Sequence, residues 1–170
     1  MRPPLTGDER AQLVGWLDHL RSLVRVKCEG LSDADAHKQL LPTSPLTTVA
    51  GLVAHLRWVE YSWFQQNLGG VPDTGQTPWT PDGHPDAEMF VDDVPLAQLL
   101  DEYDAECARS NEVVAAMNLG DVERVTVRES GPASVRYVVC HLIEETARHL
   151  GHLDIVRELL DGGVGYESMS

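Results

Sequence analysis

The chain has 170 residues, the size of one ordinary domain, and its 13 basic and 27 acidic side chains give a formal net charge of −14. This charge argues against binding to nucleic acid or to an anionic membrane surface, because both attract basic proteins. The first residues lack the apolar run of a secretion signal, and no uncharged stretch is long enough to cross a bilayer. We therefore expect one cytoplasmic domain over residues 1–170, without nucleic-acid or membrane partners.

The three cysteines, Cys28, Cys107 and Cys140, are far apart in the sequence, and none belongs to a Cys-x-x-Cys pair. Each lies within apolar or helical-looking sequence. We expect all three to be reduced and mostly buried.

The first predicted helix runs from Asp8 to about Glu29. Its apolar residues recur at steps of three and four, the period of an amphipathic helix, at Leu13, Trp16, Leu17, Leu20, Leu23 and Val24. Gly30 ends this helix, and residues 31–35 predict a short capped turn.

The second predicted helix begins near Thr47 or Thr48, because either side chain can cap the free N–H groups of a first turn. It continues to about Leu68 and ends at Gly69 and Gly70.

A long loop is predicted from Val71 to Asp93, since four prolines and two glycines interrupt this segment. We expect it to be ordered but without regular structure. Long loops in compact domains often carry function, and Trp79 and His84 make this one a candidate lid.

The third predicted helix begins near Pro95 and ends at residues 118–120. A short extended segment from Val122 to Arg128 follows, and a fourth helix runs from Ala133 to about Leu160. Four long amphipathic helices with no convincing strand pairs predict an all-α four-helix bundle, with the long loop between its second and third helices.

One face of the fourth helix carries a stripe of potential metal ligands, because steps of four, four and three residues separate His141, Glu145, His149 and His152. His55 lies among apolar residues of the second helix, and facing helices of a bundle can assemble metal sites in this way. Imidazole nitrogen and carboxylate oxygen suit zinc, nickel or iron(II). The absence of cysteine favours a catalytic site with an open position for water or substrate.

The same stripe would also fit a polar helix face without metal, on which Glu–His pairs add about 0.2–0.5 kcal/mol each. Arg148, beside the stripe, could either hold an anionic substrate or form a surface ion pair.

Two further expectations concern packing. Gly151 interrupts an otherwise good helix, at a cost of about 1 kcal/mol relative to alanine, which suggests that a helix or ligand approaches closely there. Trp16, Trp58 and Trp63 occur at helical spacings and are expected in the core.

Two segments together resemble the DinB-like proteins, of the DinB/YfiT-like bundle type, and in particular their DUF664 branch. These segments are residues 52–64, LVAHLRWVEYSWF, and residues 145–152, ETARHLGH. Proteins of this family are four-helix bundles that bind one divalent metal through a histidine of the second helix and a His-x-x-x-His pair of the fourth. Here Glu145 replaces the first histidine of that pair, which is similar to the mycothiol-dependent maleylpyruvate isomerase branch.

The resemblance implies that His55, Glu145 and His149 are the metal ligands. His152 is then a fourth ligand or a donor that orients a bound molecule, and His141 is a bystander or an outer partner of the site. Zinc is the favoured metal, with nickel and iron as alternatives.

The resemblance further implies an S-transferase or isomerase in which the metal activates a small thiol, mycothiol or bacillithiol, for reaction with an electrophile. Lys27 and Lys38 are the only lysines, and this composition of a high-GC genome favours mycothiol. A homodimer is also expected. The alternatives are a non-catalytic, stress-induced metal-binding protein, an iron(II) oxygen-activating triad, and a bundle without metal.

Overall fold

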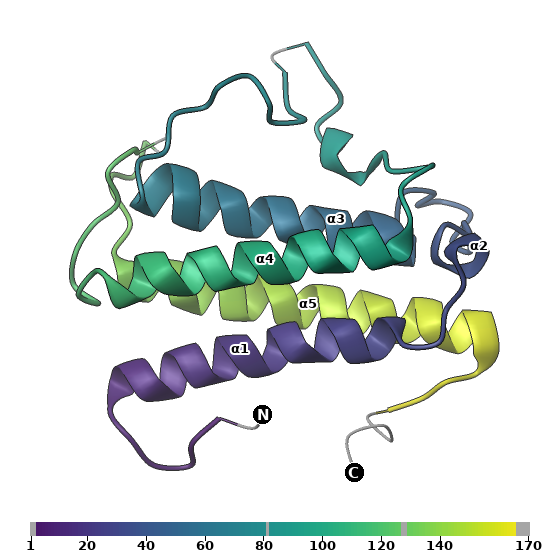
Figure 1. Cartoon of the computed structure of the whole chain (residues 1–170), viewed down its shortest axis with the longest axis horizontal. Helices are drawn as coiled ribbons and strands as arrows, with labels where there is room; N and C mark the ends of the chain where they lie inside the picture. Colours follow the sequence, from purple (N-terminus) through teal and green to yellow (C-terminus); the bar gives the residue numbers. More distant parts are fainter. Residues whose placement is uncertain (1–2, 81, 127–128, 166–170) are drawn as a thin grey trace.

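Four long helices form the body of the protein in the computed structural model, which describes residues 3–80, 82–126 and 129–165 (Figure 1). They are α1 (Glu9–Cys28), α3 (Val49–Glu60), α4 (Leu96–Ala115) and α5 (Val135–Asp161). α3 continues directly into the π-helix η1 (Tyr61–Leu68), and two short elements are α2 (Asp33–Ala36) and the 3₁₀-helix η2 (Ala87–Met89). The described residues contain no strand, only an isolated bridge between Val122 and Ser134. The predicted all-α bundle is confirmed.

Side-chain caps fix where three of the long helices begin. Asp8, Thr48 and Ser134 each accept a hydrogen bond from the backbone N–H three residues later. Each cap satisfies one N–H group that the first turn of a helix leaves without a partner. Gly162 ends α5 in the left-handed conformation, with φ of 76°, which glycine adopts without strain.

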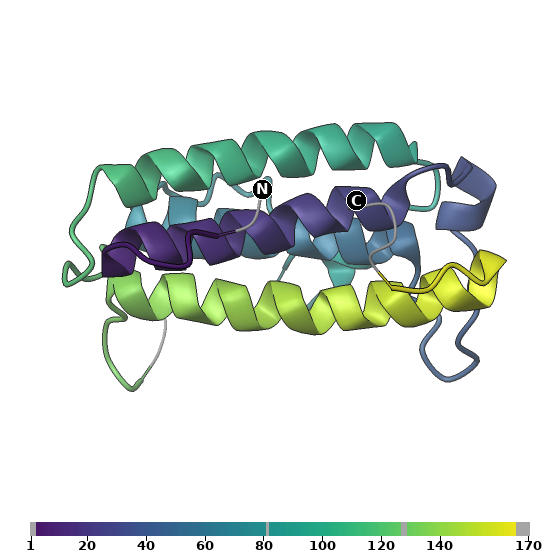
Figure 2. The same ribbon diagram turned by 90° about the horizontal axis from the view of Figure 1, so that it is seen from below.

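The directions of the helices explain the long loop. α1 and α5 run one way along the bundle, whereas α3 and α4 both run the other way (Figures 1 and 2). Because α3 and α4 are parallel, the chain must return along the length of the bundle between them. The segment between η1 and α4 makes this return above α3, as in other bundles with a crossover connection.

Two groups of buried apolar side chains fill the bundle. One lies around the first half of α3 and includes Leu52, Leu56 and Leu153; the other lies around η1 and includes Phe64 and Leu142. None of the helices in the described part of the chain combines the length and apolarity needed to cross a membrane.

The second predicted helix has the expected bounds but changes type within its length. Thr48 caps it, as expected, and the last eight residues form the π-helix η1 rather than α-helix. π-helical segments are rare and are frequent at functional sites.

The loop prediction needs one correction, because residues 87–89 form the 3₁₀-helix η2 instead of irregular chain. In the predicted extended segment, Val122 pairs with Ser134, while Val127 and Arg128 lie outside the described residues.

Three packing predictions are wrong. Cys140 is exposed on α5, whereas Cys28 and Cys107 are buried as expected. Trp16 is half exposed. Gly151 is exposed, and no atom of a neighbouring helix lies within 4 Å of the position that a Cβ would take, so the expected close approach of a helix is wrong, while the approach of a ligand stays a prediction. For Cys140 and Trp16, helical spacing alone does not show which face of the helix meets a neighbour.

Candidate metal centre

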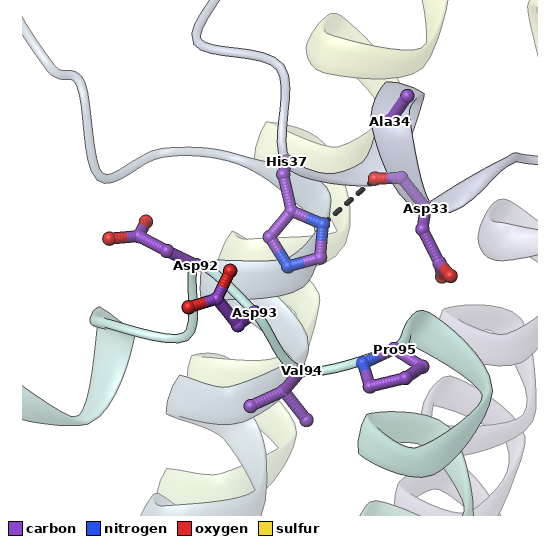
Figure 3. Close-up of a pocket in the computed structure, with 7 residues that line it drawn as sticks. All are labelled: Asp33, Ala34, His37, Asp92, Asp93, Val94 and Pro95. Carbon is purple, nitrogen blue, oxygen red and sulfur yellow. Dashed lines mark hydrogen bonds between the residues drawn. The ribbon is translucent and has the colours of Figure 1, made fainter.

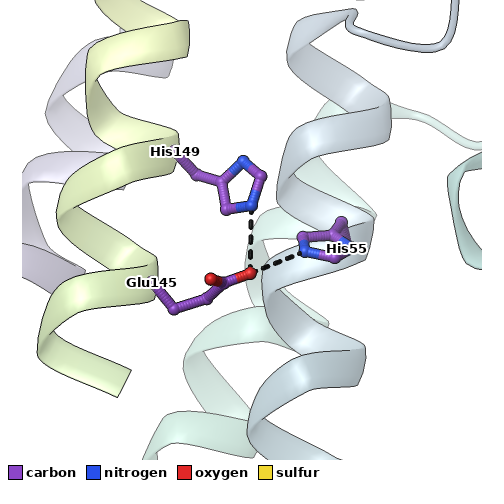
Figure 4. Close-up of side chains that lie close together, drawn as sticks. All are labelled: His55, Glu145 and His149. Atoms are coloured by element: carbon purple, nitrogen blue, oxygen red, sulfur yellow. Dashed lines mark hydrogen bonds and ion pairs between the residues drawn. The ribbon is translucent and has the colours of Figure 1, made fainter. Parts of the chain in front are cut away.

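Three predicted ligands, His55 from α3 and Glu145 and His149 from α5, meet between the two helices (Figure 4). Glu145 Oε1 lies 3.3 Å from His55 Nε2 and 3.1 Å from His149 Nε2. One donor atom from each side chain falls within 4.8 Å of the other two. Two imidazole nitrogens and one carboxylate oxygen therefore converge on one small region.

The helices determine this convergence. Glu145 and His149 are four residues apart, so they lie one above the other on the same face of α5. His55 projects from the facing side of α3, with its ring centroid 4.6 Å from that of His149. The side chains of His55, Glu145 and His149 are 19%, 12% and 14% exposed, so the cluster is held by the core but open on one side.

His152 and His141 lie beside this cluster. Nδ1 of His152 is 3.2 Å from Nδ1 of His149, on the side of that ring that faces away from Glu145. The ring of His141 instead packs against Trp63 and Tyr137, at centroid distances of 4.5 and 6.3 Å. Neither histidine belongs to the three-donor group found among the described residues.

Arg148 lies at the exposed edge of the site. Its guanidinium pairs with Glu144 and lies 3.4 Å from Glu145 Oε2, and its side chain is 55% exposed. The ion pair was one of the two roles expected from the sequence, and the exposed guanidinium is also accessible to a solute.

One residue of the site, Glu88 from η2, was not predicted from the sequence. Glu88 is 4% exposed, and its Oε1 accepts a hydrogen bond from His55 Nδ1 at 2.8 Å. Its Oε2 accepts a second bond, also of 2.8 Å, from Trp79 Nε1. Glu88 lies in an aperiodic loop 33 residues after His55, so the only indication in the sequence was an acidic residue between Ala87 and Met89.

The two residues of the candidate lid, Trp79 and His84, differ in their contacts with the site. Trp79 reaches the site through Glu88, whereas His84 contacts Phe90 and accepts a hydrogen bond from the Asp86 N–H. His84 is half exposed, and its ion-pair partner is Asp86 rather than a residue of the His55, Glu145 and His149 cluster.

The charges of the cluster follow from these contacts. Burial opposes charge on His55, but its hydrogen bonds to Glu88 and Glu145 prevail and raise the pKa of its imidazole. Burial and the neighbouring His55 lower the pKa of His149. Burial would raise the pKa of Glu145, yet the two histidines lower it. The cluster therefore favours an anionic Glu145 between a readily protonated and a neutral imidazole.

A pocket of about 280 Å³ lies at the end of the bundle near α2 (Figure 3). Its one histidine, His37, places Nδ1 2.8 Å from the Asp33 carbonyl oxygen and Nε2 2.9 Å from that of Val91. Both ring nitrogens thus contact backbone, and none of the three cluster residues lines this pocket. These backbone contacts give His37 a structural role at this end of the bundle.

Comparison with known families agrees with this geometry. The model of the mycothiol-S-transferase family matches residues 12–162, which include all four long helices except the first few residues of α1. The chain belongs to the mycothiol S-transferase family. This membership confirms the resemblance to DinB-like, mycothiol-related proteins.

Among solved structures, the crystal structure of a conserved protein from Enterococcus faecalis is similar to this mycothiol S-transferase family member. The two share 15% identity with a TM-score of 0.68, over 93% of this chain and 100% of the other. At this identity the likeness supports the bundle fold alone. No curated protein matches the chain.

Proposed function

We propose that the protein is a metal-dependent thiol S-transferase or isomerase that uses mycothiol, with His55, Glu145 and His149 as metal ligands. The observation that carries the proposal is the convergence of three donor atoms within 4.8 Å, from two helices of a mycothiol S-transferase family member. The family name supports a small thiol as substrate and group transfer as the reaction.

The donor set fits a divalent metal. Three protein ligands without cysteine are typical of catalytic zinc sites, and the same ligand types also bind nickel and iron(II). In this arrangement His152 contacts the nitrogen of His149 that faces away from Glu145, which favours an orienting role over a fourth ligand position.

A bound metal would supply a Lewis acid that lowers the pKa of a thiol and so makes the thiolate available at neutral pH. The chain itself supplies position and surroundings. α3 and α5 fix the donors from two sides. Trp79, which donates to Glu88, lies edge to face against Trp58 at a centroid distance of 5.8 Å. Arg148, at the open edge, can contact an anionic group of the electrophile.

The proposal is tested by metal analysis of protein purified without chelator, followed by conjugation and isomerisation assays with mycothiol and a panel of electrophiles. We expect about one divalent ion per chain and turnover that the substitution His149→Ala abolishes. His19→Ala, on α1, is the matched control and should retain turnover.

Other outcomes would favour other functions. Bound metal without turnover on any electrophile would support a non-catalytic metal-binding protein. Oxygen consumption after iron loading would support the oxygen-activating triad, and absence of metal uptake would leave a structural bundle. The homodimer and the cytoplasmic location stay predictions.

A further inference from the structure

We infer that Glu88 is a positioning residue that holds His55 in its ligating form and joins the long loop to the metal centre. The inference rests on the proposed function, because it takes His55 as a ligand. It adds a residue from a third element, η2, to a site otherwise built from α3 and α5.

The first step concerns the proton on His55. A carboxylate only accepts hydrogen bonds, so in the contact with Glu88 Oε1 the His55 Nδ1 is the donor, at 2.8 Å. When His55 carries a single proton, on Nδ1, the unprotonated nitrogen is Nε2, and Nε2 is the nitrogen that faces Glu145. Histidine ligands of metal sites commonly donate their other N–H to a carboxylate in this way, which fixes the ring and makes it more basic.

The second step concerns the loop. Glu88 is 4% exposed, and its other oxygen accepts from Trp79 Nε1, so one buried carboxylate receives donors from the loop and from α3. The Trp79 ring also packs against Trp58, one turn after His55 on α3. Two contacts therefore fix Trp79 close to His55, and both depend on the loop being in place.

These two steps make metal binding and loop position interdependent. If the loop arrangement favours the ligating form of His55, then a metal on His55 must favour that loop arrangement by the same factor, because binding linkage is reciprocal.

The chemistry of Glu88 makes a sharp test available. Glutamine has nearly the same shape but only one acceptor oxygen, so Glu88→Gln cannot accept from both His55 and Trp79. Its amide group must face one of the two N–H donors, or donate to Nδ1 and move the His55 proton to Nε2. Trp79→Phe keeps one aromatic ring against Trp58 and removes the N–H donor together with the smaller ring of the indole.

The first measurement is zinc affinity, by competition with a chromophoric chelator. We expect Glu88→Gln to weaken zinc binding by about 10–100-fold, and Trp79→Phe to weaken it by a smaller factor. Glu106→Gln is the matched control, because Glu106 is also buried, at 1% exposure, but lies on α4 and pairs with Arg109. Its zinc affinity should equal that of the wild type.

The second measurement is chymotryptic cleavage after Trp79, with and without zinc. Zinc should slow cleavage in the wild type. In Glu88→Gln the metal-free protein should be cleaved about tenfold faster, as expected for the loss of a hydrogen bond to a charged group, and zinc should give little protection. Circular dichroism checks that each variant is folded; if Glu88→Gln is not, the zinc affinity of Trp79→Phe decides.

Equal zinc affinity of the wild type and Glu88→Gln would overturn the inference while leaving the proposed function intact. Absence of zinc binding by the wild type would instead reject the proposed function, and with it the role of Glu88 in positioning a ligand. In that case the metal-free cleavage rates test the loop contact separately, and equal rates would overturn this part too.

Discussion

Arg21 of α1 and Glu60 of α3 form a buried, two-pronged ion pair. Nε and Nη2 of Arg21 donate to the two carboxylate oxygens at 2.8 and 2.6 Å, and the side chains are 5% and 1% exposed. Because burial removes water from both charges, each needs the other. The pair therefore holds α1 and α3 in one relative position.

Removing one partner should be costly. We expect Arg21→Leu to lower the free energy of unfolding by about 3–5 kcal/mol, because Glu60 is left buried and charged without its partner. The double variant Arg21→Leu/Glu60→Leu should recover most of this loss. Urea denaturation measures both free energies. A loss below about 1 kcal/mol in the single variant would contradict a stabilising role of the buried Arg21–Glu60 pair.

The thiols should differ strongly in reactivity. Burial raises the pKa of Cys28 to about 12 and also raises the pKa of Cys107, whereas Cys140 is exposed. At pH 8 roughly one Cys28 side chain in ten thousand is then the reactive thiolate. We expect one fast thiol with a disulfide reagent in the native state and three in urea. Cys140→Ser should remove the fast phase; a fast phase that persists would be contrary to the structure.

For single residues, the sequence predicted the position in the structure only where helical spacing determines it. Glu145 and His149 could be placed together because a helix puts residues four apart on one face, and His55 because a facing helix was expected. Glu88 could not be placed, since the path of a loop depends on contacts that no periodicity encodes. Arg21 and Glu60 likewise meet only through the packing of two helices.

α5 carries most of the candidate centre, and Gly151 interrupts it without a visible need. It is exposed, and no neighbouring atom lies within 4 Å of the position of an added Cβ. We therefore expect Gly151→Ala to raise the free energy of unfolding by about 1 kcal/mol, because alanine loses less backbone entropy in a helix. Zinc affinity should not change, as measured by the same chelator competition.

Gly162 provides the contrast for this prediction. Its φ of 76° suits glycine, so Gly162→Ala should lower the stability by about 1 kcal/mol. If Gly151→Ala destabilised the protein as well, or weakened zinc binding, then a ligand or partner would approach α5 at Gly151 after all.

The type of η1 could not have been predicted from hydrophobic spacing. Leu56, Glu60, Phe64 and Leu68 are all buried at steps of four. In an α-helix each such step turns the side chain by about 40°, so a long series would leave the core. The wider turn of a π-helix opposes this drift and keeps the last two side chains inside. The bounds of the helix were predictable from its cap and its glycines, but this compensation appears only in the packed molecule.

The four-helix architecture followed from the number and length of the amphipathic segments. The direction of the helices did not, because helices of either direction bury the same apolar stripe. The loop after η1 was the one indication, since a long connection permits parallel neighbours.

The whole molecule should respond to the metal. A ligand that binds only the folded state stabilises it, by about 2.7 kcal/mol at a free concentration one hundred times Kd. For a domain of this size that corresponds to about 5–10 °C in Tm. We expect added zinc to raise the Tm of the wild type by this order and to leave that of His149→Ala unchanged. An equal shift in both would place the bound zinc elsewhere.

The packing of the helices has a consequence for a chain cut in the crossover loop, for example at the exposed Gly75. α1 packs mainly on α5 and α3 mainly on α4, so the principal interfaces join the first half of the sequence to the second. Neither fragment holds a complete core, so we expect each to need the other in order to fold. The candidate ligands are divided between the fragments in the same way, so complementation of the two pieces should depend on the metal concentration.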